Sequence, residues 1–262
     1  MKIIKMICTL SDCYRARRKI TVKRLMLHSV GCAQPNLYVF QRIWNKPGVN
    51  ACVHAVIGAL GLVIQCLDWN WRGWHAGGIA NNDTIGVEMT EPSTIKYIGG
   101  SSWVDLDPIK TKAHVMDTYK TAVQLFAKLC KDNKLDPIKN GVIISHSEGH
   151  RRGVASNHGD VEHIWNRFGL TMNVFRQDVK KAMNTTVATK PLVVGVKPVV
   201  NNPITVTINN LVYGYKTAAD ALKDKNRVKV VPRGTYPIMI KHKSGAWNIG
   251  KGNLYWINPK EL

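Results

Sequence analysis

The sequence lacks an apolar run that could span a membrane, and it lacks a recognisable secretory signal. A membrane-spanning helix needs about 20 consecutive apolar residues, and no run approaches this length. The apolar residues at the N-terminus are too few and too interrupted by lysine to form a signal peptide. We therefore expect a protein that is made in a cytoplasm without a signal peptide and has no membrane span.

Cysteine pairs with the spacing of a zinc finger are also missing. None of the six cysteines lies in a CxxC motif, so a cysteine-based zinc site is not expected. Disulfide bonds are common in secreted proteins and rare in cytosolic ones. We therefore expect these cysteines to be reduced and mostly structural.

Acidic residues are scarce, with 17 Asp and Glu against 37 Lys and Arg and a formal net charge of +20. Residues 1–166 carry 21 basic and 13 acidic side chains, whereas the remaining 96 residues carry 16 basic and 4 acidic. A basic C-terminal part favours an anionic partner, such as nucleic acid, lipid headgroups or an acidic cell-wall polymer. Charge alone does not choose among these, and a merely solubilising surface is the alternative.

Apolar runs and turn residues predict an α/β domain in the first part of the chain. Strands are predicted at residues 22–27, 51–58, 61–67 and 84–90. Apolar residues at helical spacing predict a helix over residues 112–129, and a second helix is expected to start near Asp178. Residues 1–24 are basic and show no regular pattern.

The C-terminal part has a different pattern. Residues 185–204 lack periodicity and have the composition of an extended linker. After them, short β-type runs are separated by Gly, Asn and Pro, which suggests a small all-β barrel with one short helix near residues 217–223. We therefore divide the chain into a first domain, a linker and a small β domain at residues 1–182, 183–203 and 204–262.

Two histidines at predicted strand ends suggest a metal site. His28 and His146 each end an apolar run and each stand beside a serine. A loop rich in Gly and Ser follows His146 and brings in His158 and Asp160. Two imidazoles and a carboxylate leave one position of a zinc ion open, which is typical of catalytic sites. Such an ion lowers the pKa of bound water to about 7 and provides hydroxide that attacks a carbonyl.

The third ligand is either Asp160 or His158, because residues two apart in an extended segment project the same way. We assign Asp160 as the ligand and His158 as the donor to a developing oxyanion. Glu88 lies in a predicted strand between apolar residues, where burial raises the pKa of a carboxyl and suits a general base or acid. The alternative for Glu88 is an edge strand on which it faces solvent.

A loop rich in Trp, Gly and His spans residues 69–78. We expect His75 either to lie in a substrate groove or to support a metal ligand. Trp74 and Asn82 are assigned with it to substrate binding, although tryptophans more often pack than bind.

Four motifs occur in order within residues 12–170: His28-Ser-x-Gly, Trp74-His75-x-Gly-Gly, Ile85-Gly-Val-Glu88, and Ile-Ser-His146-Ser-Glu followed by Asn-His158-Gly-Asp160. Together they resemble the zinc-dependent N-acetylmuramoyl-L-alanine amidases of type 2, the family related to peptidoglycan recognition proteins. Within that family, the chain looks most like phage and prophage endolysins aimed at Gram-positive hosts. Any one motif alone is weak.

The resemblance implies a central mixed β-sheet flanked by helices. It also implies a Zn²⁺ cofactor on His28, His146 and Asp160, a catalytic Glu88, and hydrolysis of the amide between N-acetylmuramic acid and L-alanine. The chain departs from the family in two places, since His158 stands where Lys is frequent, and Val161-Glu162 replaces Pro-Gly.

The last sixty or so residues more loosely resemble bacterial SH3-like wall-binding modules, chiefly around Tyr236, Trp247 and Trp256. This implies a basic module that tethers the enzyme to an anionic wall polymer and raises its local concentration there. We expect the protein to reach the peptidoglycan of a Gram-positive bacterium after release through a phage holin or by host lysis.

Two alternatives remain at this point. The first is a non-catalytic peptidoglycan-binding protein of the same fold, which the presence of all three candidate ligands disfavours. The second is a nucleic-acid-binding protein, but the sequence has no nucleic-acid-binding motif beyond its charge. We therefore expect no nucleic-acid partner.

Overall fold

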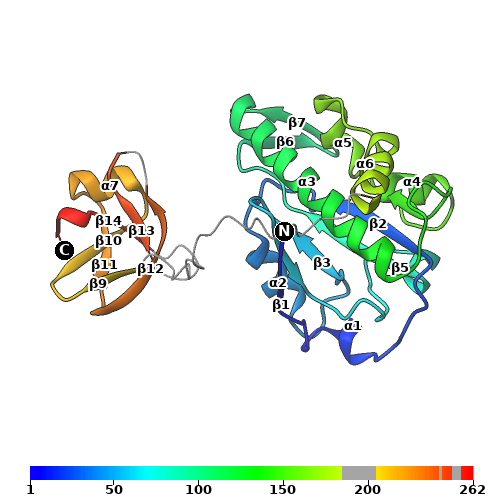
Figure 1. Cartoon of the computed structure of the whole chain (residues 1–262), viewed down its shortest axis with the longest axis horizontal. Coiled ribbons are helices and arrows are strands. Elements are labelled where there is room, and N and C mark those ends of the chain that lie inside the picture. The colour runs from blue at the N-terminus through cyan, green and yellow to red at the C-terminus, as the bar shows by residue number, and fades with distance from the viewer. Residues whose placement is uncertain (185–204, 242–243, 250–254, 262) are drawn as a thin grey trace, which may run out of the picture. The chain divides into compact units, whose positions relative to one another are not determined.

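The computed structural model describes residues 1–184, 205–241, 244–249 and 255–261 (Figure 1). The chain separates into two compact units, Met1–Thr189 and Lys190–Leu262. Apart from its first two residues, the linker predicted at residues 183–203 lies outside the described residues.

A six-stranded mixed sheet forms the centre of the first unit, in the order β1-β4-β3-β5-β2-β8. Its strands are β1 (Lys2–Lys5), β2 (Arg24–Ser29), β3 (Ala55–Ile57), β4 (Leu62–Gln65), β5 (Thr84–Met89) and β8 (Ile143–Ser145). Only the β3–β4 pair of this sheet is antiparallel. In β2, Leu25, Met26 and Leu27 are all fully buried, as expected for a strand covered on both faces. The predicted α/β class with a central mixed sheet is confirmed.

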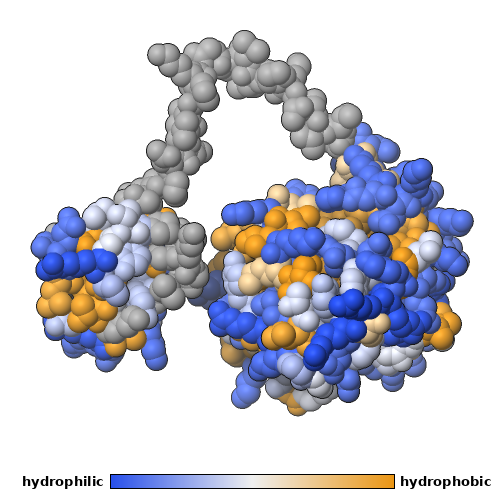
Figure 2. All heavy atoms as spheres, turned by 90° about the horizontal axis from the view of Figure 1, so that it is seen from below, coloured by the Kyte–Doolittle hydropathy of each residue, from blue (hydrophilic) through white to orange (hydrophobic). Residues whose placement is uncertain are grey.

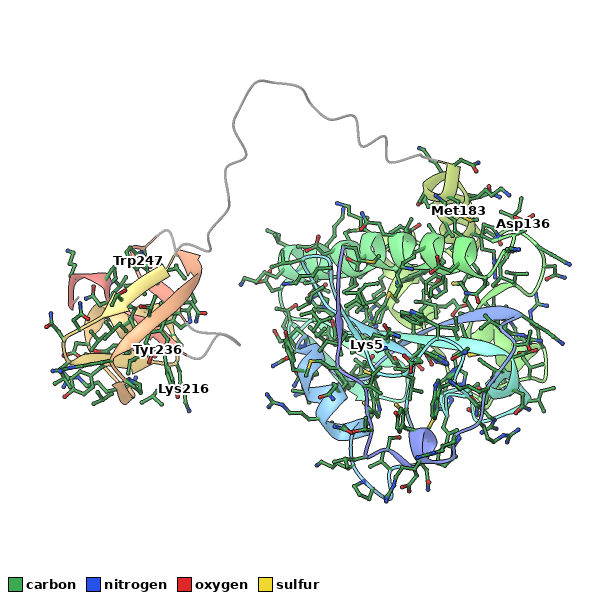
Figure 3. All side chains as sticks on the ribbon, turned by 60° about the horizontal axis from the view of Figure 1, so that its bottom comes forward. Lys5, Asp136, Met183, Lys216, Tyr236 and Trp247 are labelled. Atoms are coloured by element: carbon green, nitrogen blue, oxygen red, sulfur yellow. The ribbon has the colours of Figure 1, made fainter. Side chains whose placement is uncertain are left out.

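Helices cover both faces of this sheet (Figures 1 and 3). On one face lies α3 (Pro108–Asp132), whose N-cap Asp107 accepts the Lys110 N–H, as helix starts favour. Beside it packs α6 (Met172–Asn184). On the other face lie α1 (Asp12–Arg15) and α2 (Leu37–Trp44). Shorter elements complete the unit: η1 (Ile79–Asn82), β6 (Ile95–Gly99), β7 (Ser102–Asp105), α4 (His146–Arg151), α5 (Glu162–Trp165) and η2 (Asn166–Phe168).

Three details of the predicted elements differ from the structure. The N-terminal segment is not irregular throughout, because residues 2–5 form β1, which pairs in parallel with β4. The strand predicted at 51–58 is shorter, since Cys52 pairs with Trp74 instead of joining the sheet. The helix expected to start near Asp178 is α6, which begins at Met172.

The second unit contains a six-stranded sheet in the order β11-β10-β14-β13-β12-β9, and the strand pairs among its described residues are all antiparallel. Its elements are β9 (Thr205–Ile208), β10 (Val212–Tyr215), α7 (Ala218–Lys223), β11 (Arg227–Val231), β12 (Gly234–Lys241), β13 (Trp247–Ile249), β14 (Tyr255–Ile257) and η3 (Pro259–Glu261). Tyr236 and Trp247, labelled in Figure 3, pack against its apolar core. A small all-β barrel with one short helix near residues 217–223 was predicted here. The antiparallel strands are consistent with a small β domain, and α7 is the short helix.

All six cysteines are free thiols, and five of them are buried. No helix in the described ranges combines the length and apolarity needed to cross a membrane. On the face seen in Figure 2, hydrophilic residues are interspersed with apolar ones.

Candidate metal centre and active-site cleft

A cleft of about 710 Å³ opens where β2, β5 and β8 end. Ligand sites commonly lie beyond the carboxyl ends of parallel strands. The residues lining the cleft include His28, Trp74, His75, Glu88, Tyr97, His146, His158, Asp160 and His163. Seven of the eight predicted site residues therefore meet in one place.

His28, His146 and Asp160 form a buried cluster in which their ligand atoms all lie within 4.8 Å of one another. The two Nδ1 atoms are 3.0 Å apart. The Asp160 carboxylate lies 3.4 Å from Nδ1 of His28 and 3.7 Å from Nδ1 of His146. Ligand atoms about 2.0–2.1 Å from a tetrahedral zinc are on the order of 3.3 Å apart. The donor set and its spacing therefore fit a zinc ion.

The elements that carry these ligands explain why they meet. His28 belongs to β2, while His146 begins α4 immediately after β8. Ser145 caps this helix, because its hydroxyl accepts the Glu148 N–H while the Glu148 side chain accepts the Ser145 N–H. Strands β2 and β8 are parallel neighbours, so the two histidines lie at the same end of the sheet, where the strands finish.

Hydrogen bonds determine which nitrogen His28 keeps free. Nε2 of His75 is 3.2 Å from the carbonyl oxygen of Thr84, which only accepts, so this nitrogen carries the proton. Nδ1 of His75 then accepts from Nε2–H of His28 at 2.9 Å. Burial, together with the nearby His28, lowers the pKa of His75 well below its usual value and keeps the ring neutral. Nδ1 of His28 is left with a lone pair that faces the cluster.

His146 is oriented in the same way by Ser156. Its Nε2 lies 3.1 Å from Oγ of Ser156, whose hydroxyl also lies 3.2 Å from the Ala76 carbonyl. The hydroxyl donates to that carbonyl and accepts from Nε2–H of His146, so Nδ1 of His146 is free to bind a metal. Burial and the neighbouring His28 lower the pKa of His146 to about 4, and a neutral imidazole is the form that binds a metal.

The loop that contains His75 needs two further residues for its shape. The side chain of Asn81 accepts the backbone N–H groups of His75 and Ala76 at 3.0 and 2.9 Å. A Cβ atom on Gly86 of β5 would lie only 2.4 Å from the His75 ring. Gly86 therefore leaves the space that this ring occupies.

Glu88 stands next to His28 in the sheet register, and it lies on β5, between β2 and β3, rather than on an edge strand. Its Oε2 atom is buried, with no hydrogen-bond partner among the residues that the structure describes. Burial, with the charges of Asp160 and Glu91, raises the pKa of Glu88 well above its usual value. These properties suit a group that takes up and releases a proton during a reaction.

The remaining predicted residues lie at different distances from the cluster. His158 is exposed, lines the cleft, and has its ring centroid 4.3 Å from that of His146. Trp74 also lines the cleft. Asn82 does not line it, and its side chain accepts a hydrogen bond from Arg72 instead. Its neighbour Asn81, which was not predicted from the sequence, holds the His75 loop.

The sequence pattern of the N-acetylmuramoyl-L-alanine amidase family matches residues 17–161, which is more than half of the chain. The chain belongs to this family. The matched range contains all of the predicted site residues. Enzymes of this family act on peptidoglycan and are typically zinc-dependent, which agrees with the cluster of His28, His146 and Asp160.

Solved structures of amidases and endolysins share the fold. The hydrolase AmiA of Staphylococcus aureus, solved in complex with its ligand, matches with a TM-score of 0.52 and 14% identity over 70% of this chain and 83% of its own. A mutant endolysin from Bacillus subtilis matches with a TM-score of 0.50 and 15% identity, over 68% of this chain and 99% of its own. PlyL matches with a TM-score of 0.50 and 16% identity, over 68% of this chain and 97% of its own. A comparison with curated protein sequences found no match.

Proposed function

We propose that this amidase-family protein is a zinc-dependent endolysin that cleaves the amide between N-acetylmuramic acid and L-alanine in the peptidoglycan of a Gram-positive bacterium. The convergence of two imidazole Nδ1 lone pairs and one carboxylate beside Glu88 carries this proposal. A purely structural zinc site would be closed by four protein ligands. Here three ligands border an open cleft.

Zinc bound to His28, His146 and Asp160 would polarise the substrate carbonyl and make water more acidic. Glu88 accepts the proton of the attacking water and passes it to the leaving nitrogen. His158 donates a hydrogen bond to the oxygen that gains negative charge. Trp74 offers an apolar wall of the cleft to the substrate, and His75 acts through His28 rather than on the substrate.

The second unit is proposed to be an SH3-like module that binds an anionic wall polymer. Residues 204–262 carry 10 basic and 3 acidic side chains. Two of these acids are engaged within the unit, because Asp224 pairs with Arg227 and Asp220 accepts from Asn226. Such a module would concentrate the catalytic unit at an insoluble wall after release from the cytoplasm by a holin or by lysis.

The decisive experiment uses purified Gram-positive peptidoglycan and follows new amino termini and new reducing sugars, with and without a zinc chelator. New L-alanine amino termini without new reducing ends, abolished by chelation and restored by zinc, support the proposal. Retention on the wall without any release of amino groups would instead mean a non-catalytic peptidoglycan-binding protein.

A further inference from the structure

A second buried carboxylate borders the metal cluster. Glu91 follows β5 and is 1% exposed. Its Oε1 atom accepts the Gly31 N–H at 2.9 Å and the hydroxyl of Ser29, and its Oε2 atom accepts the hydroxyl of Tyr97 at 2.7 Å. A buried carboxylate is costly unless it is paired or hydrogen-bonded. Here its donors come from the segment after His28 and from β6.

Ser29 connects Glu91 to the third ligand. Its hydroxyl donates to Glu91, and its backbone N–H donates to Oδ2 of Asp160 at 3.3 Å. The residue next to His28 in the chain is therefore held by Glu91 and itself holds the carboxylate of Asp160.

Tyr97 connects Glu91 to the segment around Asp160. Because its single hydroxyl proton goes to Glu91, the Tyr97 oxygen accepts from Nε2–H of His163 at 2.7 Å. The backbone N–H of His163 donates to the Gly159 carbonyl at 3.2 Å, and its own carbonyl accepts Nε1–H of Trp103 at 3.0 Å. Asp160 thus lies in a short segment, residues 159–163, that His163 ties to both strands of the β6–β7 hairpin.

We propose that Glu91 and Tyr97 are positioning residues of the metal centre. They hold Ser29 and residues 159–163 so that the Asp160 carboxylate meets the two imidazoles. This inference rests on the proposed function, because it assigns the network to zinc binding. Outer partners of metal ligands typically contribute about 10- to 100-fold to metal affinity, whereas a role in folding alone would affect stability and leave the affinity of the folded protein unchanged.

The first unit offers a matched control in Tyr119. Like Tyr97, it is a tyrosine whose hydroxyl donates to a carboxylate at 2.7 Å, in this case Asp178. Tyr119 belongs to α3 and Asp178 to α6, and Tyr119 does not line the cleft. Tyr119→Phe therefore removes a similar hydrogen bond without touching the network around Asp160.

The test measures the zinc affinity of the metal-free full chain by competition with a chromophoric chelator, in the absence of substrate. Tyr97→Phe should weaken zinc binding by up to roughly 10-fold, the low end of what direct partners of metal ligands contribute, while Tyr119→Phe should bind zinc like the wild type. Glu91→Gln keeps the size of the side chain and an acceptor for Ser29, so its loss should be smaller than that of Tyr97→Phe. Thermal unfolding of each metal-free variant shows whether it is folded.

The outcomes separate the two proposals. A wild type that binds zinc, with folded Tyr97→Phe and Glu91→Gln variants of unchanged affinity, would overturn the positioning role alone. A wild type that does not bind zinc would overturn the proposed function and this inference with it. If Tyr97→Phe does not fold, Glu91→Gln decides, because unchanged zinc affinity in that variant contradicts the proposal.

Discussion

The buried histidines of the first unit differ in whether they keep a ring nitrogen free. His54 uses both nitrogens, since Nδ1 accepts the Gly86 N–H and Nε2 donates to the Trp71 carbonyl. His28 and His146 use Nε2 for a neighbouring side chain and keep Nδ1 for the cluster. A histidine with both nitrogens engaged cannot also bind a metal without losing a bond, so His54 is a structural residue.

Glu88→Gln is expected to reduce peptidoglycan hydrolysis by about 10²- to 10⁴-fold, the usual contribution of a general acid–base group. Zinc content should be unchanged, because Glu88 is not one of the three clustered ligands. The measurements are amino-terminus release from purified walls and zinc per chain. His28→Ala is the contrasting variant and should lose both hydrolytic activity and bound zinc. Near-normal turnover in Glu88→Gln would rule out its role in proton transfer.

The raised pKa of Glu88 also predicts a pH effect on the rate. A general base works only when it is deprotonated, so kcat/KM should fall as the pH decreases through a value above the usual glutamate pKa of about 4.3. The residual activity of Glu88→Gln should lack this decline. A wild-type rate that stays constant down to the ordinary glutamate range would contradict the assignment.

At the scale of elements, the strands that carry the site residues could be predicted from the sequence. The residues that hold those side chains in place could not. The apolar runs that become β2, β5 and β8 place His28, Glu88 and His146 at the carboxyl ends of neighbouring parallel strands. The helix α3 follows from the spacing of its apolar residues. Ser156 and Glu91 act on residues 10 and 62 positions away in the chain. No local pattern reveals such pairs, since they depend on how distant segments cross.

The β6–β7 hairpin was missed for a related reason. Its residues alternate only weakly between buried and exposed, and its turn is set by Gly99 and Gly100, which both have positive φ. β1 was missed because four residues with lysine at both ends carry little strand signal, and it forms by pairing with β4. Tertiary pairing rather than local propensity determines both elements.

The turn of the β6–β7 hairpin lies close to Gly159, the residue before Asp160. A Cβ atom there would lie 2.6 Å from Oγ of Ser101. Gly159→Ala therefore requires the Ser101 hydroxyl to rotate away, so we expect only a small loss of wall hydrolysis, which the double variant Gly159→Ala/Ser101→Gly should remove. Release of amino termini by the single and double variants measures this. If the double variant is as impaired as Gly159→Ala, the contact with Ser101 is not the cause.

His54 joins β5 to the Trp71 loop only while it is neutral. Burial lowers its pKa to about 4, against about 6.5 in an unfolded chain. Because the unfolded state takes up the proton first as the pH falls, stability should decrease from about pH 6.5 down to about pH 4, by about 3 kcal/mol in full. The unfolding free energy of metal-free protein, measured across this range, should decline more steeply for the wild type than for His54→Gln. Equal slopes would contradict this prediction.

At the scale of the whole molecule, we propose that catalysis and wall binding lie in separate units, and each unit has its own arrangement of charge. Around the cleft, the carboxyl groups of Glu88, Glu91 and Asp160 lie close to the proposed cation. The second unit instead carries a net positive charge on a small β scaffold. Attraction to an anionic polymer is long-ranged and weakened by salt, whereas metal binding in a buried cluster is much less screened.

Charge reversal in the second unit should therefore weaken wall binding without changing the chemistry. The triple variant Lys216→Glu, Lys223→Glu and Lys225→Glu changes exposed residues, and it should sediment less with purified walls at low salt while hydrolysing a soluble muramyl peptide at the wild-type rate. Reversing Lys112 and Lys120, which are exposed on α3, is the control for net charge. If both sets of changes weaken sedimentation equally per charge, binding follows the overall charge of the protein and the second unit is not the wall-binding module.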